Sequence, residues 1–101
     1  MKVVHCKKKP YDVYIGRAAR GLEGSIWANP FHIGKHGNRE EVIAKYRQYI
    51  LSRPDLLARL EELRGKTLGC WCAPLPCHGH VLIELLGEGH ESQPQQLRLL
   101  V

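Results

Sequence analysis

Residues 67–87 have the sequence TLGCWCAPLPCHGHVLIELLG, from which the class of the fold can be predicted. Its first five residues favour a short strand, and two prolines mark the turn that follows. Residues 79–86 are mostly apolar and predict a helix, which Gly87 ends. A strand that leads through a short turn into a helix is typical of α/β domains.

The chain before residue 67 begins with two short strands and a long loop. Residues 3–6 and 13–15 are rich in β-branched and aromatic side chains, so they predict strands. Residues 16–37 contain five glycines and have no hydrophobic periodicity, which predicts a loop. A loop of this length in a compact domain is usually functional or mobile.

Two helices are predicted between this loop and residue 67. Asn38 and Glu41 have the spacing of a capping box. The apolar face that follows at helical spacing comprises Val42, Ile43, Tyr46, Tyr49 and Ile50. Pro54 suits the first turn of a second helix. The buried stripe of that helix is expected to comprise Leu56, Leu57, Leu60 and Leu63, with Gly65 at its end.

The predicted order of elements is therefore β-β-α-α-β-α. This order places the chain in the α/β class, with a small mixed, largely parallel sheet and flanking helices. We assign residues 1–87 to a single α/β domain. We expect residues 88–101 to form a C-terminal tail, which is either an edge strand or disordered.

Composition excludes several classes of protein. Of the 101 residues, 44% are hydrophobic and 25% are charged, as in ordinary globular domains and unlike disordered chains. No apolar run approaches the roughly 20 residues of a membrane span, so no membrane partner is expected. The first seven residues lack the apolar stretch of a secretory signal. We therefore expect a cytoplasmic protein with reduced thiols.

The net charge of +5 is unevenly distributed. Residues 1–39 hold eight lysines and arginines against two acidic residues, whereas acidic residues slightly outnumber basic ones in residues 40–101. Such asymmetry suits an anionic partner, namely phosphate, a nucleotide or a nucleic acid. A solvated basic surface that only aids solubility explains the charge equally well.

Three of the four cysteines lie within eight residues, which suits a metal or reactive site better than a disulfide staple. Cys70 and Cys72 share one face of a strand, and Cys77 and His78 fall at the start of a helix. These four residues form a chemically sensible zinc set, in which His80 is a rival ligand. A nucleophilic or redox-active cysteine at the helix start is a second interpretation, and simple packing of buried thiols is a third.

Two segments are expected to meet where a ligand binds. Ligands of α/β sheets bind beyond the carboxyl ends of the strands, near helix N-termini. Gly16-Arg17 follows one predicted strand, and residues 72–79 follow another. Trp27 and Asn29 of the long loop suit base stacking and hydrogen bonding, although a tryptophan in a loop more often anchors the loop to the core. The candidate ligand-binding residues are Gly16, Arg17, Trp27, Asn29, Cys72, Cys77, His78 and Gly79.

Three of these motifs carry a resemblance to a known family. They are YIGR at residues 14–17, WANPF at residues 27–31 and CWCAPLPCHG at residues 70–79. Together they resemble the phage and bacterial family called domain of unknown function 4326. The resemblance spans residues 3–86 and implies a small α/β domain, with no established activity.

We therefore expect a nucleotide- or nucleic-acid-related domain that binds an anionic ligand at the carboxyl edge of its sheet. Whether it acts as an enzyme or as a binding module stays open from the residues alone. The alternative is a small interaction domain stabilised by a structural zinc ion in the Cys/His site.

Overall fold

A three-stranded parallel sheet forms one layer of the fold in the computed structural model, which describes residues 1–87. The strands are β1 (Lys2–His5), β2 (Val13–Tyr14) and β3 (Thr67–Cys70). β3 is central, and its Gly69 is paired with Val4 of β1 and with Tyr14 of β2. The predicted α/β class is confirmed, and the sheet is parallel throughout. The predicted tail, residues 88–101, lies outside the described residues.

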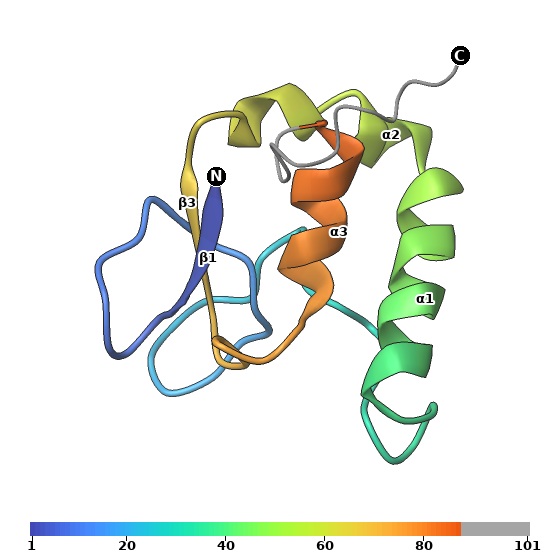
Figure 1. Ribbon diagram of the computed structural model, residues 1–101, viewed down its shortest axis with the longest axis horizontal. Helices are drawn as coiled ribbons and strands as arrows, with labels where there is room; N and C mark the ends of the chain where they lie inside the picture. The colour runs from blue at the N-terminus through green and yellow to red at the C-terminus, as the bar shows by residue number, and fades with distance from the viewer. Residues whose placement is uncertain (88–101) are drawn as a thin grey trace.

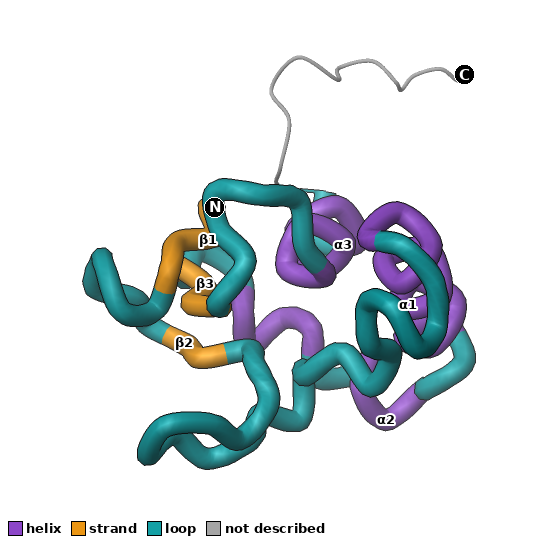
Figure 2. The backbone as a smooth tube through the Cα atoms, turned by 90° about the horizontal axis from the view of Figure 1, so that it is seen from below, coloured by secondary structure: helices purple, strands orange, loops and turns teal. Residues whose placement is uncertain are grey.

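Two helices lie on one side of the sheet, one behind the other. They are α1 (Arg39–Leu51) and α3 (His78–Leu85). α3 lies between the sheet and α1, so the fold has three successive layers (Figures 1 and 2). No helix within residues 1–87 combines the length and apolarity needed to cross a membrane.

Both helices begin with a side-chain cap. At α1 the Asn38 Oδ1 atom accepts a hydrogen bond from the Glu41 amide at 2.9 Å, and Glu41 Oε1 accepts from the Asn38 amide at 2.8 Å. The predicted capping box is therefore confirmed. At α3 the cap is Cys77, whose thiol accepts from the Gly79 amide at 3.3 Å. The start of α3 is thus fixed by a sulfur atom.

The single second helix predicted over residues 54–63 is wrong. The structure instead has α2 (Pro54–Leu57) and a short 3₁₀ helix, η1 (Leu60–Leu63). Three residues complete one turn of a 3₁₀ helix, so Leu60 and Leu63 lie on the same side of η1. Both side chains are buried, as is Leu56, whereas Leu57 is only half-buried. The break therefore turns the leucines toward the core.

The core lies between the sheet and the helices. Tyr46, Leu68 and Leu82 have no solvent exposure, as the apolar periodicity predicts. Gly79 lets α3 approach the sheet closely, because a Cβ atom there would lie 2.8 Å from Ile15 Cδ1 and 2.9 Å from Val3 Cγ2. This approach holds the start of α3 against the carboxyl end of the sheet.

The carboxyl ends of the strands lie at one edge because the sheet is parallel. The loop after β2 and the turn between β3 and α3 both leave from this edge. Trp71, the last residue of the predicted third strand, is half-exposed. β3 ends at Cys70, so Trp71 already belongs to the turn. The structure thereby places an indole ring beside the edge where ligands bind α/β sheets.

Candidate functional site

A cavity of about 440 Å³ opens at the carboxyl ends of β2 and β3. Its wall comes from the loop after β2, the first turns of α1 and the turn between β3 and α3. Many of the residues that line it were predicted from the sequence, namely Gly16, Arg17, Asn29, Cys70, Cys72, Cys77 and His78. The two segments expected to meet at one edge of the sheet therefore do so.

Trp27 and Gly79, also predicted to bind ligand, do not line the cavity. Trp27 is only 3% exposed, and its carbonyl oxygen accepts a hydrogen bond from Tyr46 Oη at 2.6 Å. The tryptophan thus anchors the long loop to α1, which was the alternative interpretation of this residue. Gly79 lies where α3 packs closely on the sheet, so its role there is steric.

Asn29 combines a structural role with a place in the cavity wall. Its Oδ1 atom accepts from the Phe31 amide at 2.9 Å, and its Nδ2 atom donates to the Val42 carbonyl at 3.4 Å. The side chain is buried, so its polar atoms are satisfied by the protein. Its main function in this structure is to shape the loop that carries Phe31 into the wall.

Within residues 1–87 three arginines line the cavity, of which only Arg17 was predicted from the sequence. Arg17 Nη1 donates to the Asn29 carbonyl at 2.6 Å, and Arg39 Nη1 donates to the Pro76 carbonyl at 3.1 Å. Each of these bonds leaves further guanidinium N–H groups for a ligand. Within residues 1–87, no aspartate or glutamate lines the cavity, and none forms an ion pair with these arginines. The wall is therefore strongly positive.

Arg20, the third arginine, is positioned by a strained turn. Its φ of 48° lies in the left-handed region that residues other than glycine rarely adopt. Ala19 and Leu22 close the turn with two backbone hydrogen bonds, of 3.1 and 2.8 Å. The Arg20 guanidinium carbon then lies 5.8 Å from the centre of the Trp71 ring. The turn thus brings a cation and an aromatic face together.

Tyr14 holds Trp71 in place. Its hydroxyl accepts from Trp71 Nε1 at 2.7 Å and donates to the Arg17 carbonyl at 2.6 Å. Gly16 permits this arrangement, because a Cβ atom at that position would lie 2.4 Å from the Tyr14 hydroxyl oxygen. Gly16 therefore has a steric function beside its place in the cavity wall.

The thiols of Cys70 and Cys77 are in contact. Their Sγ atoms lie 3.2 Å apart, and both residues are almost fully buried. The hydrogen bond from Cys70 and that from the Gly79 amide hold the pKa of Cys77 below its ordinary value, although burial opposes this. For Cys70, a hydrogen bond with Cys72 lowers the pKa, but its bond to Cys77 and its burial outweigh that effect and raise it. Cys77 is therefore the thiol that ionises most readily of the two.

Cys72 is the half-buried member of the thiol group. Its hydrogen bond to Cys70, followed by burial, raises its pKa well above the ordinary value. A hydrogen bond with the Arg39 guanidinium opposes this shift. Cys72 is consequently a neutral thiol at the cavity wall.

His78 is neutral in the folded protein. Its Nε2 atom lies 2.7 Å from the Ile15 carbonyl oxygen, and a carbonyl can only accept, so Nε2 carries the proton. Burial is the main cause that lowers the pKa of His78 to about 4. The imidazole therefore couples the start of α3 to the residue that follows β2.

The structure does not assemble the predicted zinc set of Cys70, Cys72, Cys77 and His78. The proton-bearing Nε2 of His78 faces a carbonyl, and Nδ1 of the rival ligand His80 accepts from the Cys77 amide at 3.1 Å. Within residues 1–87, no group of three or more His, Cys, Asp or Glu side chains is placed to hold a metal ion. The zinc-stabilised interaction domain stays a prediction.

Fold and site together define a small parallel α/β domain with a basic, thiol-lined cavity at the carboxyl edge of its sheet. The profile of the family described as "Domain of unknown function (DUF4326)" matches residues 2–88. The chain therefore belongs to this family, and the resemblance found from its motifs is confirmed. No solved structure matches the chain significantly.

Two viral proteins are similar to the chain. One is the "Uncharacterized protein R718" of Acanthamoeba polyphaga mimivirus, 44% identical over 86 residues. The other is the "Uncharacterized 12.4 kDa protein in nrdA-td intergenic region" of Enterobacteria phage T4, 36% identical over 90 residues. The alignments cover 73% and 84% of this chain. They span 65% of the mimivirus protein and 76% of the phage protein.

Proposed function

We propose that the protein binds a nucleotide in the cavity at the carboxyl edge of its sheet. The observation that carries the proposal is the presence of Arg17, Arg20 and Arg39 in one cavity where, among residues 1–87, no carboxylate neutralises them. Guanidinium groups bind phosphate through paired, charge-assisted N–H donors. The phosphates would occupy the space between these arginines.

The size and the aromatic wall of the cavity support a nucleotide over a bare phosphate ion. A volume of about 440 Å³ lies within the roughly 300–1,000 Å³ usual for small-molecule sites. Phe31 and Trp71 provide aromatic surfaces in the same wall. Nucleobases stack on such surfaces. Phosphate recognition and base stacking are therefore both available in one site.

A cytoplasmic location fits the same proposal. The four cysteines are unpaired, and the two that touch are held as thiols. Thiols persist in reducing compartments, where free nucleotides are also found.

Calorimetric titration of ADP tests the proposal. Arg39→Gln removes a guanidinium from the cavity wall, and we expect the dissociation constant for ADP to rise about 10–100-fold, as is usual for loss of a charge-assisted hydrogen bond. The matched control is Arg59→Gln, because Arg59 pairs with Glu62 and does not line the cavity. The control is expected to bind ADP like the unchanged protein.

Two results would overturn the proposal that the cavity binds a nucleotide. The first is that neither ADP nor any other nucleoside diphosphate binds at low salt. The second, binding of a single-stranded RNA oligomer more than about 100-fold tighter than ADP, with equal losses in the Arg17→Gln and Arg39→Gln variants, would replace the nucleotide by a nucleic acid.

A further inference from the structure

The contact between Cys70 and Cys77 has a chemistry that phosphate binding does not use. Cys70 is the last residue of β3, and Cys77 is the cap of α3. Their Sγ atoms, 3.2 Å apart, belong to residues that are 1% and 2% exposed. Both residues line the cavity, so a small molecule reaches them from there and not from the outer surface.

We propose that Cys70 and Cys77 are a redox pair that a hydroperoxide entering the cavity oxidises to a disulfide. The proposal is independent of nucleotide binding, because it rests on the sulfur geometry and on the access that the cavity gives. The sulfur atoms need to approach each other by about 1 Å to reach the roughly 2.05 Å of a disulfide.

Cys77 is the thiol that attacks the peroxide. As the cap of α3 it accepts the Gly79 amide at 3.3 Å, and the Cys70 thiol donates to it as well. Both bonds favour the thiolate, which is the reactive form of cysteine. The Cys77 sulfur attacks one peroxide oxygen and the O–O bond breaks. The second oxygen leaves and takes up a proton as water, or as an alcohol from an organic hydroperoxide, and Cys77 becomes a sulfenic acid.

Cys70 then completes the reaction. Its sulfur attacks the Cys77 sulfur, the S–O bond breaks, and the departing hydroxide takes the proton of the Cys70 thiol to leave as water. In total two thiols lose two electrons and two protons, and hydrogen peroxide is reduced to two molecules of water. An added dithiol reverses the oxidation by thiol–disulfide exchange.

The neighbouring cysteines provide internal controls. Cys72 holds its proton firmly, because its thiol donates to Cys70, so it is expected to stay reduced. Cys6 is more exposed than the pair but does not line the cavity. Faster oxidation of the two buried thiols than of Cys6 would therefore reflect the cavity and the thiolate, and not simple exposure.

Peptide mapping of the folded, unchanged protein tests the pairing. The protein is treated with hydrogen peroxide, its free thiols are alkylated, and trypsin releases residues 67–98 as one peptide, since neither lysine nor arginine occurs between Lys66 and Arg98. We expect this peptide to lose two hydrogens and to carry one alkyl group, on Cys72. Dithiothreitol should restore two further alkylation sites, at Cys70 and Cys77.

Two variants separate the steps. Cys72→Ser should form the same disulfide, whereas Cys70→Ser should stop at a sulfenic acid that dimedone traps on Cys77. A disulfide or sulfenic acid at Cys72, or oxidation of Cys6 before the pair, would overturn the proposal. So would failure of Cys70 and Cys77 to react while peroxide oxidises the same thiols in the unfolded protein.

Discussion

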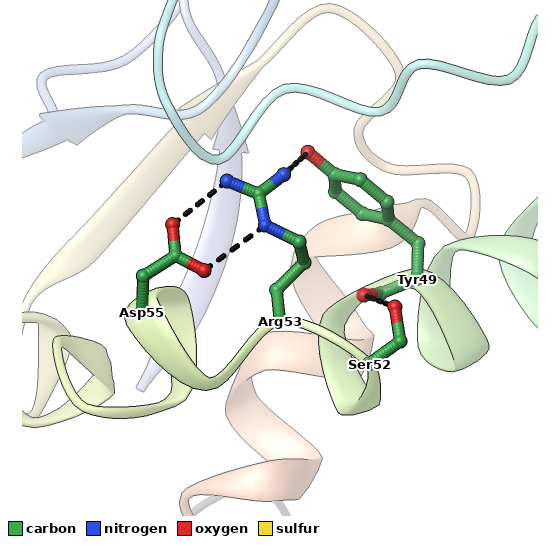
Figure 3. A network of polar contacts seen from close by, with 4 residues as sticks. All are labelled: Tyr49, Ser52, Arg53 and Asp55. Atoms are coloured by element: carbon green, nitrogen blue, oxygen red, sulfur yellow. Dashed lines mark hydrogen bonds and ion pairs between the residues drawn. The ribbon is translucent and has the colours of Figure 1, made fainter.

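The arginines of residues 53–64 and those of the cavity are treated differently by the fold. Arg53 donates to both carboxylate oxygens of Asp55, at 3.0 and 2.7 Å, and also to the Tyr49 hydroxyl (Figure 3). Arg59 and Arg64 each pair with a glutamate three residues away. In contrast, the cavity arginines donate to backbone carbonyls or lie near an aromatic ring.

The difference indicates where the excess charge of the protein is available. A guanidinium beside a carboxylate is locally neutralised, and exposed pairs of this kind contribute little to stability. A guanidinium whose partners are all neutral groups keeps its full charge. Three of the eight basic residues of residues 1–39 thus line the cavity with their charge available, whereas the segment from residue 53 to residue 64 presents a balanced surface.

The largest expected effect tests what holds the balanced segment in place. Leu60 is buried in the core, and its replacement by alanine leaves a cavity. We expect Leu60→Ala to lower the free energy of unfolding by about 2–5 kcal/mol, measured by urea denaturation. Arg59→Gln is the matched control from the same turn and should leave the midpoint unchanged. Equal losses in both variants would mean that ion pairs hold the segment.

The second effect concerns acid stability at the cavity edge. The pKa of His78 is about 4 in the folded protein, below the ordinary 6.5, so protons bind the unfolded chain preferentially. The stabilisation from neutral His78 is complete above pH 6.5 and is lost as the pH falls to 4. It amounts to about 3 kcal/mol.

Urea denaturation between pH 7 and pH 4 measures this loss. His78→Asn should reduce the dependence on pH over this window, because asparagine does not titrate. His80→Asn, which changes an exposed side chain of the same helix, should leave it intact. A pH dependence that survives in His78→Asn would place its origin elsewhere.

A smaller effect sharpens the contrast between the two sets of arginines. Tyr14→Phe removes the hydroxyl that accepts from Trp71 Nε1 and donates to the Arg17 carbonyl. We expect the free energy of unfolding to fall by about 0.5–1.5 kcal/mol for each hydrogen bond lost. We also expect a weaker affinity for ADP, because the indole and the loop are no longer held in place. Tyr49→Phe, which removes a partner of Arg53 from the balanced surface, should not change ADP affinity. If the unchanged protein and both variants bind ADP equally well, Trp71 does not contribute to ADP binding.

Local signals of the sequence predicted the helices and the sheet well. The capping pair Asn38 and Glu41 marks the start of α1, and the strand–turn–helix order of residues 67–87 places the thiols at the right edge. The division of the second helix could not be predicted, because leucines spaced by three and four suit either an α-helix or a 3₁₀ turn. Which of them forms depends on how those side chains meet the core.

The candidate site was only partly predictable. Arg17 follows a strand and could be identified from its place, but Arg20 and Arg39 reach the cavity through loop folding and through the position of α1. No spacing in the sequence indicates either of them. Trp71 was predicted to be the last residue of a strand but belongs to the turn, since the strand ends one residue earlier, at Cys70.

Whether the cavity arginines bind an anionic ligand can be measured by comparing a charged ligand with its uncharged counterpart. ADP and adenosine are titrated into the unchanged protein at two salt concentrations. We expect ADP to bind at least about tenfold more tightly than adenosine, and added salt to weaken the binding of ADP alone. Equal affinities for both ligands, unaffected by salt, would contradict this expectation.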